Sequence, residues 1–123
     1  MLSDMVNRLF EHDRDTNARR QSLAGQSPAG ASLWPMLSEL GILGIQVPEA
    51  WGGMAQSAQD NAIASHLVAK AMGRSLATEP FISTAVVAAS LLSELGSTAQ
   101  KQALLPALIA GRLKGCWKWR HLL

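Results

Sequence analysis

The stretch PFISTAVVAASLLSELGSTAQ, residues 80–100, decides the fold. Its first part, residues 81–95, carries so many apolar side chains that a helix formed there has almost no polar side, which is typical of a helix at the centre of a protein. Gly96 ends this helix, and the Ser97–Gln100 pattern is a capping box that begins the next one. The stretch therefore predicts a central helix joined by a short turn to a second helix.

The composition agrees with a helical fold. The chain has 123 residues, enough for one small domain. Alanine (19 residues) and leucine (18) far outnumber valine and isoleucine (10 together), and β-branched side chains lose rotamer freedom in helices. Apolar residues make up 48% and charged residues 16% of the chain, which excludes a disordered polar protein. The balance also disfavours an all-β fold.

Two helices are predicted in the N-terminal part of the chain. The first begins at Ser3, whose side chain can serve as an N-cap, and continues as a solvated polar segment over residues 11–21. A loop over residues 24–30 separates it from the second helix, which runs from about Ser32 to Leu40. Gly41 stops the second helix in the left-handed conformation that only glycine adopts cheaply.

The remaining elements follow from similar signals. The apolar segment 41–48 is predicted to be extended. Ser57 begins a third helix with a wide buried face, which ends at Gly73–Arg74. The helix that begins at Ser97 is predicted to kink at Pro106 and to end at Gly111. The sequence therefore predicts an all-α bundle of about five helices with short connections.

The sequence contains no complete catalytic or metal-binding set. The three histidines are far apart, the single cysteine can form no internal disulfide, and the glycine-rich segments match neither a dinucleotide loop nor a P-loop. We interpret His66, on the third helix, as a boundary residue between the buried and exposed faces. The carboxylates near element ends fit capping roles better than a paired acid and base: Glu49, Asp60, Glu79 and Glu94. We assign no catalytic, cofactor-binding or metal-ligating residue.

The charge changes abruptly near residue 112. Residues 1–111 hold 7 Lys/Arg and 9 Asp/Glu, whereas residues 112–121 hold four basic residues and no acidic one. We therefore divide the chain into a helical domain, residues 1–113, and a basic, aromatic tail, residues 114–123. The tail could bind a membrane surface or a nucleic acid. We favour the alternative that it is unpacked and comes from truncation or a shifted reading frame, and we expect no membrane or nucleic-acid partner.

The expected location is the cytoplasm. No apolar run approaches the roughly 18 residues that a membrane-spanning helix needs. Asp4 stands where a signal peptide would carry basic residues before a long apolar stretch. These two features predict a soluble protein.

Four ordered segments resemble the N-terminal helical domain of the acyl-CoA dehydrogenase family over roughly residues 1–113. The segment Val47–Gly53 matches the family's P-E-x-aromatic-G-G turn. The other three, in their expected order and spacing, are Trp34–Ile45, Met72–Phe81, and Leu95–Lys101 together with Leu105–Gly111. The pattern Gly-Arg-x-Leu-Ala-x-Glu-Pro-Phe is similar to that of bacterial members such as pimeloyl-CoA dehydrogenase small subunits and steroid-degrading relatives.

The resemblance implies a flavoprotein oxidoreductase of fatty acid metabolism. Full-length members join this helical domain to a β domain that cradles FAD and to a C-terminal helical bundle. They remove the α proton of an acyl-CoA with a carboxylate while FAD accepts the β hydrogen as hydride. The resemblance also implies an acyl-CoA substrate, and it is compatible with a homo- or hetero-oligomer. It ends near Leu113, before any position that could inherit the catalytic carboxylate or a flavin-binding segment.

The resemblance carries over four candidate substrate-binding residues. In relatives, the helix equivalent to residues 80–92 lines the acyl-chain end of the substrate cleft, so the candidates are Pro80, Ser83, Thr84 and Val87. The alternative is that these residues serve ordinary packing, because an acyl cavity and a helical core have the same kind of lining.

Two hypotheses about function follow. In the first, the chain is the N-terminal part of an FAD-dependent acyl-CoA dehydrogenase, and alone it neither binds FAD nor dehydrogenates. In the second, it is a freestanding helical interaction module that pairs with a separate chain carrying the flavin domain. Apolar surface left uncovered would then mark the partner site.

Overall fold

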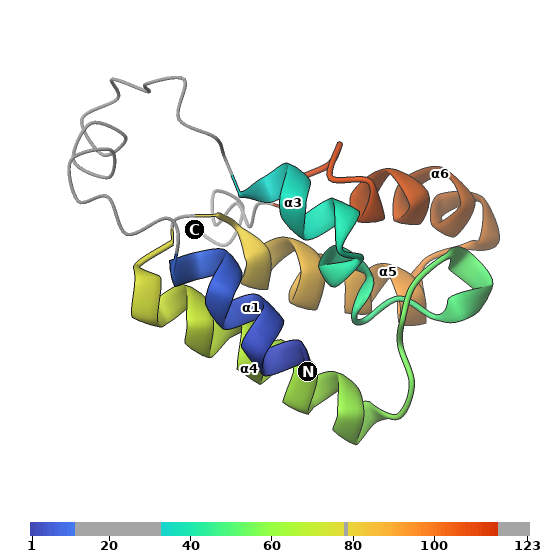
Figure 1. Cartoon of the computed structure of the whole chain (residues 1–123). Helices are drawn as coiled ribbons and strands as arrows, with labels where there is room; N and C mark the ends of the chain where they lie inside the picture. The colour runs from blue at the N-terminus through green and yellow to red at the C-terminus, as the bar shows by residue number, and fades with distance from the viewer. Residues whose placement is uncertain (12–32, 78, 116–123) are drawn as a thin grey trace, which may run out of the picture.

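The computed structural model of the chain describes residues 1–11, 33–77 and 79–115. Within these ranges the protein contains five α-helices and no strand, which confirms the predicted all-α class (Figure 1). The α-helices are α1 (Leu2–Glu11), α3 (Trp34–Glu39), α4 (Ala58–Ser75), α5 (Ala89–Leu95) and α6 (Thr98–Ile109). The shorter elements are two 3-10 helices, η1 (Ile42–Gly44) and η2 (Glu49–Trp51), and a π-helix, η3 (Ile82–Ala88).

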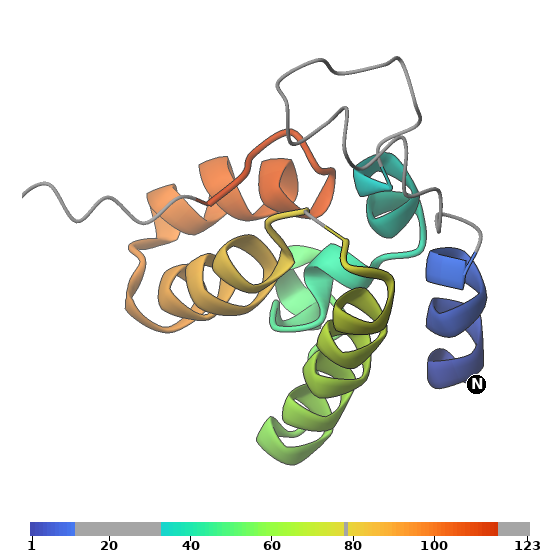
Figure 2. The same ribbon diagram turned by 90° about the vertical axis from the view of Figure 1, so that its left-hand side faces the viewer.

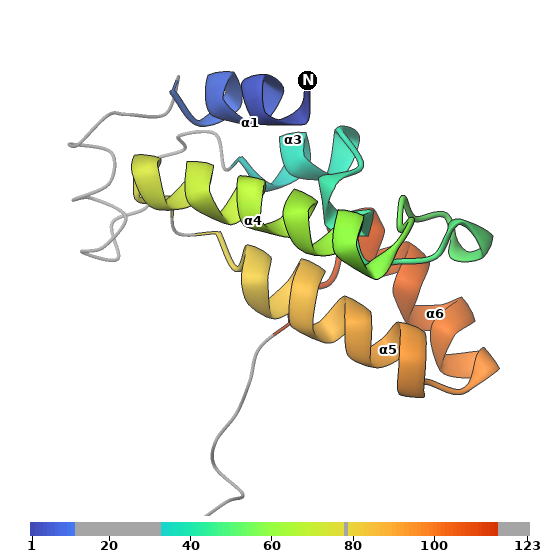
Figure 3. The same ribbon diagram turned by 90° about the horizontal axis from the view of Figure 1, so that it is seen from below.

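The helices pack as neighbouring pairs. Helix α1 lies along α4, as Figure 3 shows, and η3 continues directly into α5. Helix α6 lies beside α5 (Figure 2). One buried cluster joins α1, α3 and α4 and includes Phe10, Leu37 and Val68, while a second joins α5 and α6 through Ala89 and Leu105. These two clusters hold the pairs together.

The central helix predicted over residues 81–95 is present, but its first half is a π-helix. The N–H of Ala89 donates to the carbonyl of Thr84, five residues earlier. The apolar pattern did not reveal this change, because side chains that are apolar on nearly all sides give no periodicity from which to tell four-residue from five-residue hydrogen bonds. Phe81, Thr84 and Ala85 are fully buried, so the helix is central as predicted.

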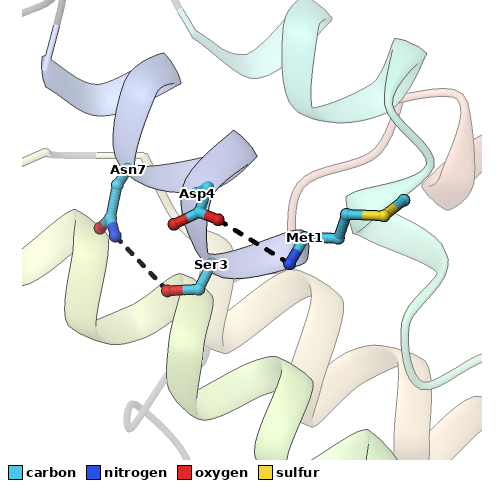
Figure 4. Close-up of polar contacts among 4 residues, drawn as sticks. All are labelled: Met1, Ser3, Asp4 and Asn7. Carbon is cyan, nitrogen blue, oxygen red and sulfur yellow. Dashed lines mark hydrogen bonds and ion pairs between the residues drawn. The ribbon is translucent and has the colours of Figure 1, made fainter.

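The start of α1 differs from the prediction. Ser3 lies inside the first turn instead of capping it, because the helical hydrogen bonds already begin with Met5 N–H donating to Met1 O at 3.1 Å. The hydroxyl of Ser3 accepts from Asn7 Nδ2 at 3.4 Å (Figure 4). The carboxylate of Asp4 lies 4.0 Å from the amino terminus, and an acidic residue there suits the positive end of the helix dipole.

The segment predicted to be extended forms a 3-10 helix instead. Gly41 has φ +73°, the left-handed conformation predicted for it, and η1 follows at once. The side chains of Ile42, Leu43 and Ile45 are all buried against one cluster. An extended strand would send neighbouring side chains to opposite faces. The helical turn buries them together, which a short apolar run cannot predict by itself.

The P-E-x-aromatic-G-G turn has a structural explanation at both glycines. Gly52 has φ +86°, which favours glycine. A Cβ on Gly53 would overlap the backbone carbonyl of Val47, because the chain doubles back there and Ala55 N–H donates to Val47 O at 3.0 Å. The turn therefore requires two consecutive glycines.

The remaining helix ends agree largely with the sequence signals. Ser57 accepts from the N–H of Asp60, and Ser97 and Gln100 form the reciprocal capping box. Helix α3 begins at Trp34, and α6 continues past Pro106 to Ile109, while Gly111 has φ +73°. The predicted polar continuation 11–21 beyond Glu11, the loop 24–30, Ser32 and tail residues 116–123 lie outside the described residues.

Candidate functional site

An open groove of about 660 Å³ lies where α4 ends and η3 begins. Helix α4 contributes Ala69, Met72 and Gly73, and the connection after it contributes Leu76, Ala77, Glu79, Pro80 and Phe81. The π-helix contributes Ile82, Ser83 and Val87. The volume falls within the range of about 300–1,000 Å³ that is typical of small-molecule sites.

The groove exists because α4 ends in an unusual way. Leu76 adopts φ +55°, the left-handed conformation, and it is the only described residue other than glycine with a positive φ. Its N–H donates to Gly73 O at 3.3 Å, and Ala77 N–H donates to Met72 O at 3.0 Å. This cap turns the chain away from the helix axis and holds the Leu76 side chain beside the groove.

The groove presents apolar side chains to solvent. Leu76 is 62%, Ile82 50% and Val87 40% exposed. Exposed apolar side chains that gather around one hollow form a surface that suits an apolar ligand or partner. The groove also has free space, because a Cβ on Gly73 would meet no atom within 4 Å.

Among the described residues that line the groove, Glu79 is the one that carries a charge. Its Oε1 accepts the backbone N–H of Leu33 at 3.1 Å, and Leu33 precedes the first residue of α3. The sequence predicts a capping role for this carboxylate, and the structure shows it bonded to the backbone at a helix start 46 positions away. This hydrogen bond joins the lining of the groove to the start of α3.

Three of the four candidate substrate residues line the groove: Pro80, Ser83 and Val87. The fourth, Thr84, does not. It is fully buried on another side of η3, where its Oγ1 accepts the N–H of Gly115 at 2.7 Å. Sequence alone missed the contributions of Met72, Gly73 and Leu76, because nothing in a helical pattern shows that a helix ends beside another element.

The first two residues of the predicted tail contact the helical domain. Ser83 Oγ donates to Gly115 O at 2.8 Å, and Lys114 Nζ lies 5.4 Å from the centre of a Trp34 ring. Gly115 therefore contacts η3, whereas Lys114 is exposed, and the division of the chain after residue 113 stays a prediction. Composition could not show this, because backbone groups of Gly115 make the contacts.

The described residues offer little support for other kinds of site. They contain no group of three or more His, Cys, Asp or Glu side chains that could hold a metal ion. His66 lies on α4 and is exposed, so it is not at the boundary between the buried and exposed faces. His12, His121 and Cys116 lie outside the described residues. None of the helices in the described ranges has the length and apolar character needed to cross a membrane.

The lining of the groove also does not fit FAD. The diphosphate of FAD needs cations or a helix N-terminus with free N–H groups. The groove lies between the C-terminal end of α4 and the N-terminal end of η3, which have opposite effects on an anion. The charged residue in the described lining is an acid, Glu79, and the described lining contains no cation that could bind a diphosphate.

Comparison with known proteins agrees with this description. The family model described as acyl-CoA dehydrogenase, N-terminal domain, matches residues 1–112. A search of curated proteins and a search of solved structures found no match. The family match covers every described helix and the whole groove. The chain therefore belongs to the acyl-CoA dehydrogenase family, of which it carries the N-terminal helical domain.

Proposed function

We propose that this chain supplies the acyl-tail part of the substrate site of an FAD-dependent acyl-CoA dehydrogenase. The observation that carries the proposal is the groove between α4 and η3, where Leu76, Ile82 and Val87 stand exposed around open space. An apolar chain that covers them removes their surface from water. Each buried methylene group contributes about 0.8 kcal/mol, so a tail of several methylenes gains enough to bind.

The hydrogen-bonding groups of the groove support an apolar ligand. The hydroxyl of Ser83 donates to Gly115 O at 2.8 Å and approaches Pro80 O at 3.3 Å. The Glu79 carboxylate accepts from Leu33 N–H. Pro80 has no N–H to offer. In the described lining, Ser83 Oγ and Glu79 Oε1 are thus engaged within the protein, and most of the other side chains offered to a ligand are hydrocarbon.

The proposal assigns no catalytic base to the described residues. In the family's reaction a carboxylate removes the α proton of the acyl thioester, and FAD supplies the redox chemistry. Glu79, the carboxylate of the groove, is held by the start of α3, and the groove does not fit FAD. We therefore propose that base and flavin come from outside this chain, and that the chain alone neither binds FAD nor dehydrogenates. Stoichiometric flavin absorbance, or dye reduction that depends on acyl-CoA, would contradict this part.

The experiment that tests the proposal fills the groove. Leu introduced at position 73 projects into open space, since a Cβ on Gly73 meets no atom within 4 Å. We expect Gly73→Leu to keep the helical circular dichroism of the wild type and to lose octanoyl-CoA binding, measured by titration calorimetry. The matched control is Ala62→Leu, an exposed position on the same helix outside the groove lining, which should bind as the wild type does.

The result can go against the proposal in a clear way. Coenzyme A without an acyl group serves as the second control, because it lacks the tail. Equal binding of octanoyl-CoA by Gly73→Leu and Ala62→Leu would show that the tail lies elsewhere. Equal affinity for octanoyl-CoA and coenzyme A in the wild type would show that the groove does not take the tail at all.

A second candidate function is a helical interaction module that pairs with a separate flavin-domain chain. The observation in its favour is apolar exposure beyond the groove lining, on α5, where Leu91 is 45% and Leu95 79% exposed. Co-purification from the native host tests this candidate. A chain that is recovered alone, without a flavin-containing partner, argues against it.

Three finer points belong to the same proposal. A relation to the pimeloyl-CoA dehydrogenase small subunits is testable with pimeloyl-CoA, whose terminal carboxylate would meet Glu79 and no cation in the described lining. We therefore expect octanoyl-CoA to bind more tightly than pimeloyl-CoA. A homo- or hetero-oligomer is tested by analytical ultracentrifugation, and the expected cytoplasmic location by cell fractionation.

A further inference from the structure

The backbone of Gly115 is held at both ends by neighbouring side chains of the π-helix. Gly115 N–H donates to Thr84 Oγ1 at 2.7 Å, and Gly115 O accepts from Ser83 Oγ at 2.8 Å. Consecutive residues can share a partner in this way because a π-helix has more residues per turn than an α-helix, so neighbouring side chains diverge less. Two side chains thus bind one residue that is more than 30 positions away.

Only glycine fits at this position. A Cβ on Gly115 would lie 2.7 Å from the carbonyl oxygen of Ser83 and 3.0 Å from Ala88 Cβ. Both atoms belong to η3, and one of them is backbone, so neither can move without moving the helix. Gly115 is therefore pressed directly against η3.

The same helix is the wall of the groove. Ile82, Ser83 and Val87 line the groove, whereas Thr84 and Ala88 contact Gly115. Ser83 belongs to both sets, since it lines the groove and donates to Gly115 O. The wall is thus one helix thick, with the groove on one side and Gly115 against another.

We propose that Ser83 and Thr84 are positioning residues, which hold Gly115 and thereby fix the place of the groove wall. Displacement of Gly115 shifts η3 and so changes the shape of the groove. Conversely, a ligand that binds in the groove changes the environment of Gly115. The identity of that ligand as an acyl chain rests on the function proposed above. The coupling between Gly115 and the wall does not.

The alternative is that Gly115 serves only to fasten a chain segment. In that case, removal of its hydrogen bonds lowers the stability but leaves the groove unchanged. The two interpretations differ in the methyl groups of Ile82 and Val87, which line the groove and take no part in the two hydrogen bonds that hold Gly115. Their NMR resonances report the shape of the wall without any ligand.

The experiment compares Thr84→Val and Gly115→Ala with Ser93→Ala in the 123-residue chain. Thr84→Val keeps the shape of the side chain and removes the acceptor, and Gly115→Ala displaces the segment sterically. Ser93→Ala also removes a hydroxyl from the same continuous helix, but Ser93 Oγ has no hydrogen-bond partner among the described residues. We expect the methyl resonances of Ile82 and Val87 to shift in the first two variants and to stay unchanged in Ser93→Ala.

Octanoyl-CoA provides the second readout. We expect it to shift the amide resonance of Gly115 in the wild type and to bind about fivefold more weakly to Thr84→Val, as loss of one hydrogen bond suggests. Unchanged methyl resonances in Thr84→Val, once its Gly115 amide resonance has moved, would overturn the coupling. Absence of octanoyl-CoA binding together with shifted methyl resonances would overturn the proposed function and leave the coupling in place. The Gly115→Ala result counts only if the circular dichroism of this variant matches that of the wild type. If it does not, the Thr84→Val result alone tests the coupling.

Discussion

Leu76 occupies a backbone conformation that glycine adopts more easily, and we expect a reversal of the usual order of alanine and glycine there. Its φ is +55°, and its side chain is 62% exposed beside the groove. The left-handed conformation costs an L-residue roughly 1–2 kcal/mol. Leu76→Ala keeps this cost, whereas Leu76→Gly removes it. Both variants lose nearly the same side-chain contacts, so their difference isolates the backbone.

The expected magnitude follows from two terms. Glycine has more freedom than alanine in the unfolded chain, which lowers stability by about 0.4–1 kcal/mol. Subtracting this from the relieved strain leaves the glycine variant more stable than the alanine variant by about 1 kcal/mol. Within a helix the order is the opposite, with glycine about 0.5–1 kcal/mol less stable than alanine. The sign of the difference therefore reports the local conformation.

Urea unfolding, followed by circular dichroism, measures this difference. We expect the glycine variant to unfold at the higher urea concentration with an unchanged slope. We also expect both variants to bind octanoyl-CoA more weakly than the wild type, because both remove apolar surface from the groove. An alanine variant as stable as the glycine variant would refute the reasoning about the end of α4. Wild-type affinity in both variants would show that the Leu76 side chain does not contact the acyl tail.

Three further substitutions test the packing around the groove and the turns. Ser93→Ala should raise the free energy of unfolding by about 1 kcal/mol, because Ser93 Oγ is buried and lacks a partner within the described ranges; a loss of stability in thermal unfolding would show that this hydroxyl is bonded. Gly53→Ala should lower the melting temperature strongly, because its Cβ would lie 2.5 Å from Val47 Cβ and closer still to the Val47 carbonyl; a melting temperature equal to the wild type would mean that the turn is open. Ser97→Ala should cost about 1 kcal/mol through loss of the capping box at α6, and Thr98→Ala, next along the chain, is the control that should cost less.

The sequence predicts the helices well where one residue type has one physical role. Ser57 and Ser97 cap helices because a hydroxyl satisfies a free N–H, and Gly41 ends α3 because it tolerates a left-handed backbone. Prediction failed where the signal was ambiguous. The short apolar run after Gly41 has no period, so it could not distinguish a strand from the 3-10 helix η1. The unbroken apolar pattern after Pro80 likewise did not reveal the π-helix.

The groove was predictable only in part. The resemblance to the family placed Pro80, Ser83 and Val87 at a substrate cleft, and all three line the groove. It placed Thr84 there too, although Thr84 faces Gly115. The difference arises because the side chains of neighbouring residues in a helix point in different directions. An alignment of positions alone does not show in which direction each side chain points. The residues of α4 line the groove because the chain turns at Leu76, which has a left-handed φ. No local sequence pattern indicated this conformation.

The dependence of affinity on acyl length tests the central claim most directly. Octanoyl-CoA has four more methylene groups than butanoyl-CoA, and each contributes about 0.8 kcal/mol when fully buried. In an open groove that covers half of each group, the four contribute about 1.6 kcal/mol, which corresponds to an affinity about fifteenfold higher. We expect calorimetric titration of the chain to show this increase and to show its loss in Gly73→Leu. Equal affinities for butanoyl-CoA and octanoyl-CoA in the wild type would contradict the claim that the groove between α4 and η3 holds an acyl tail.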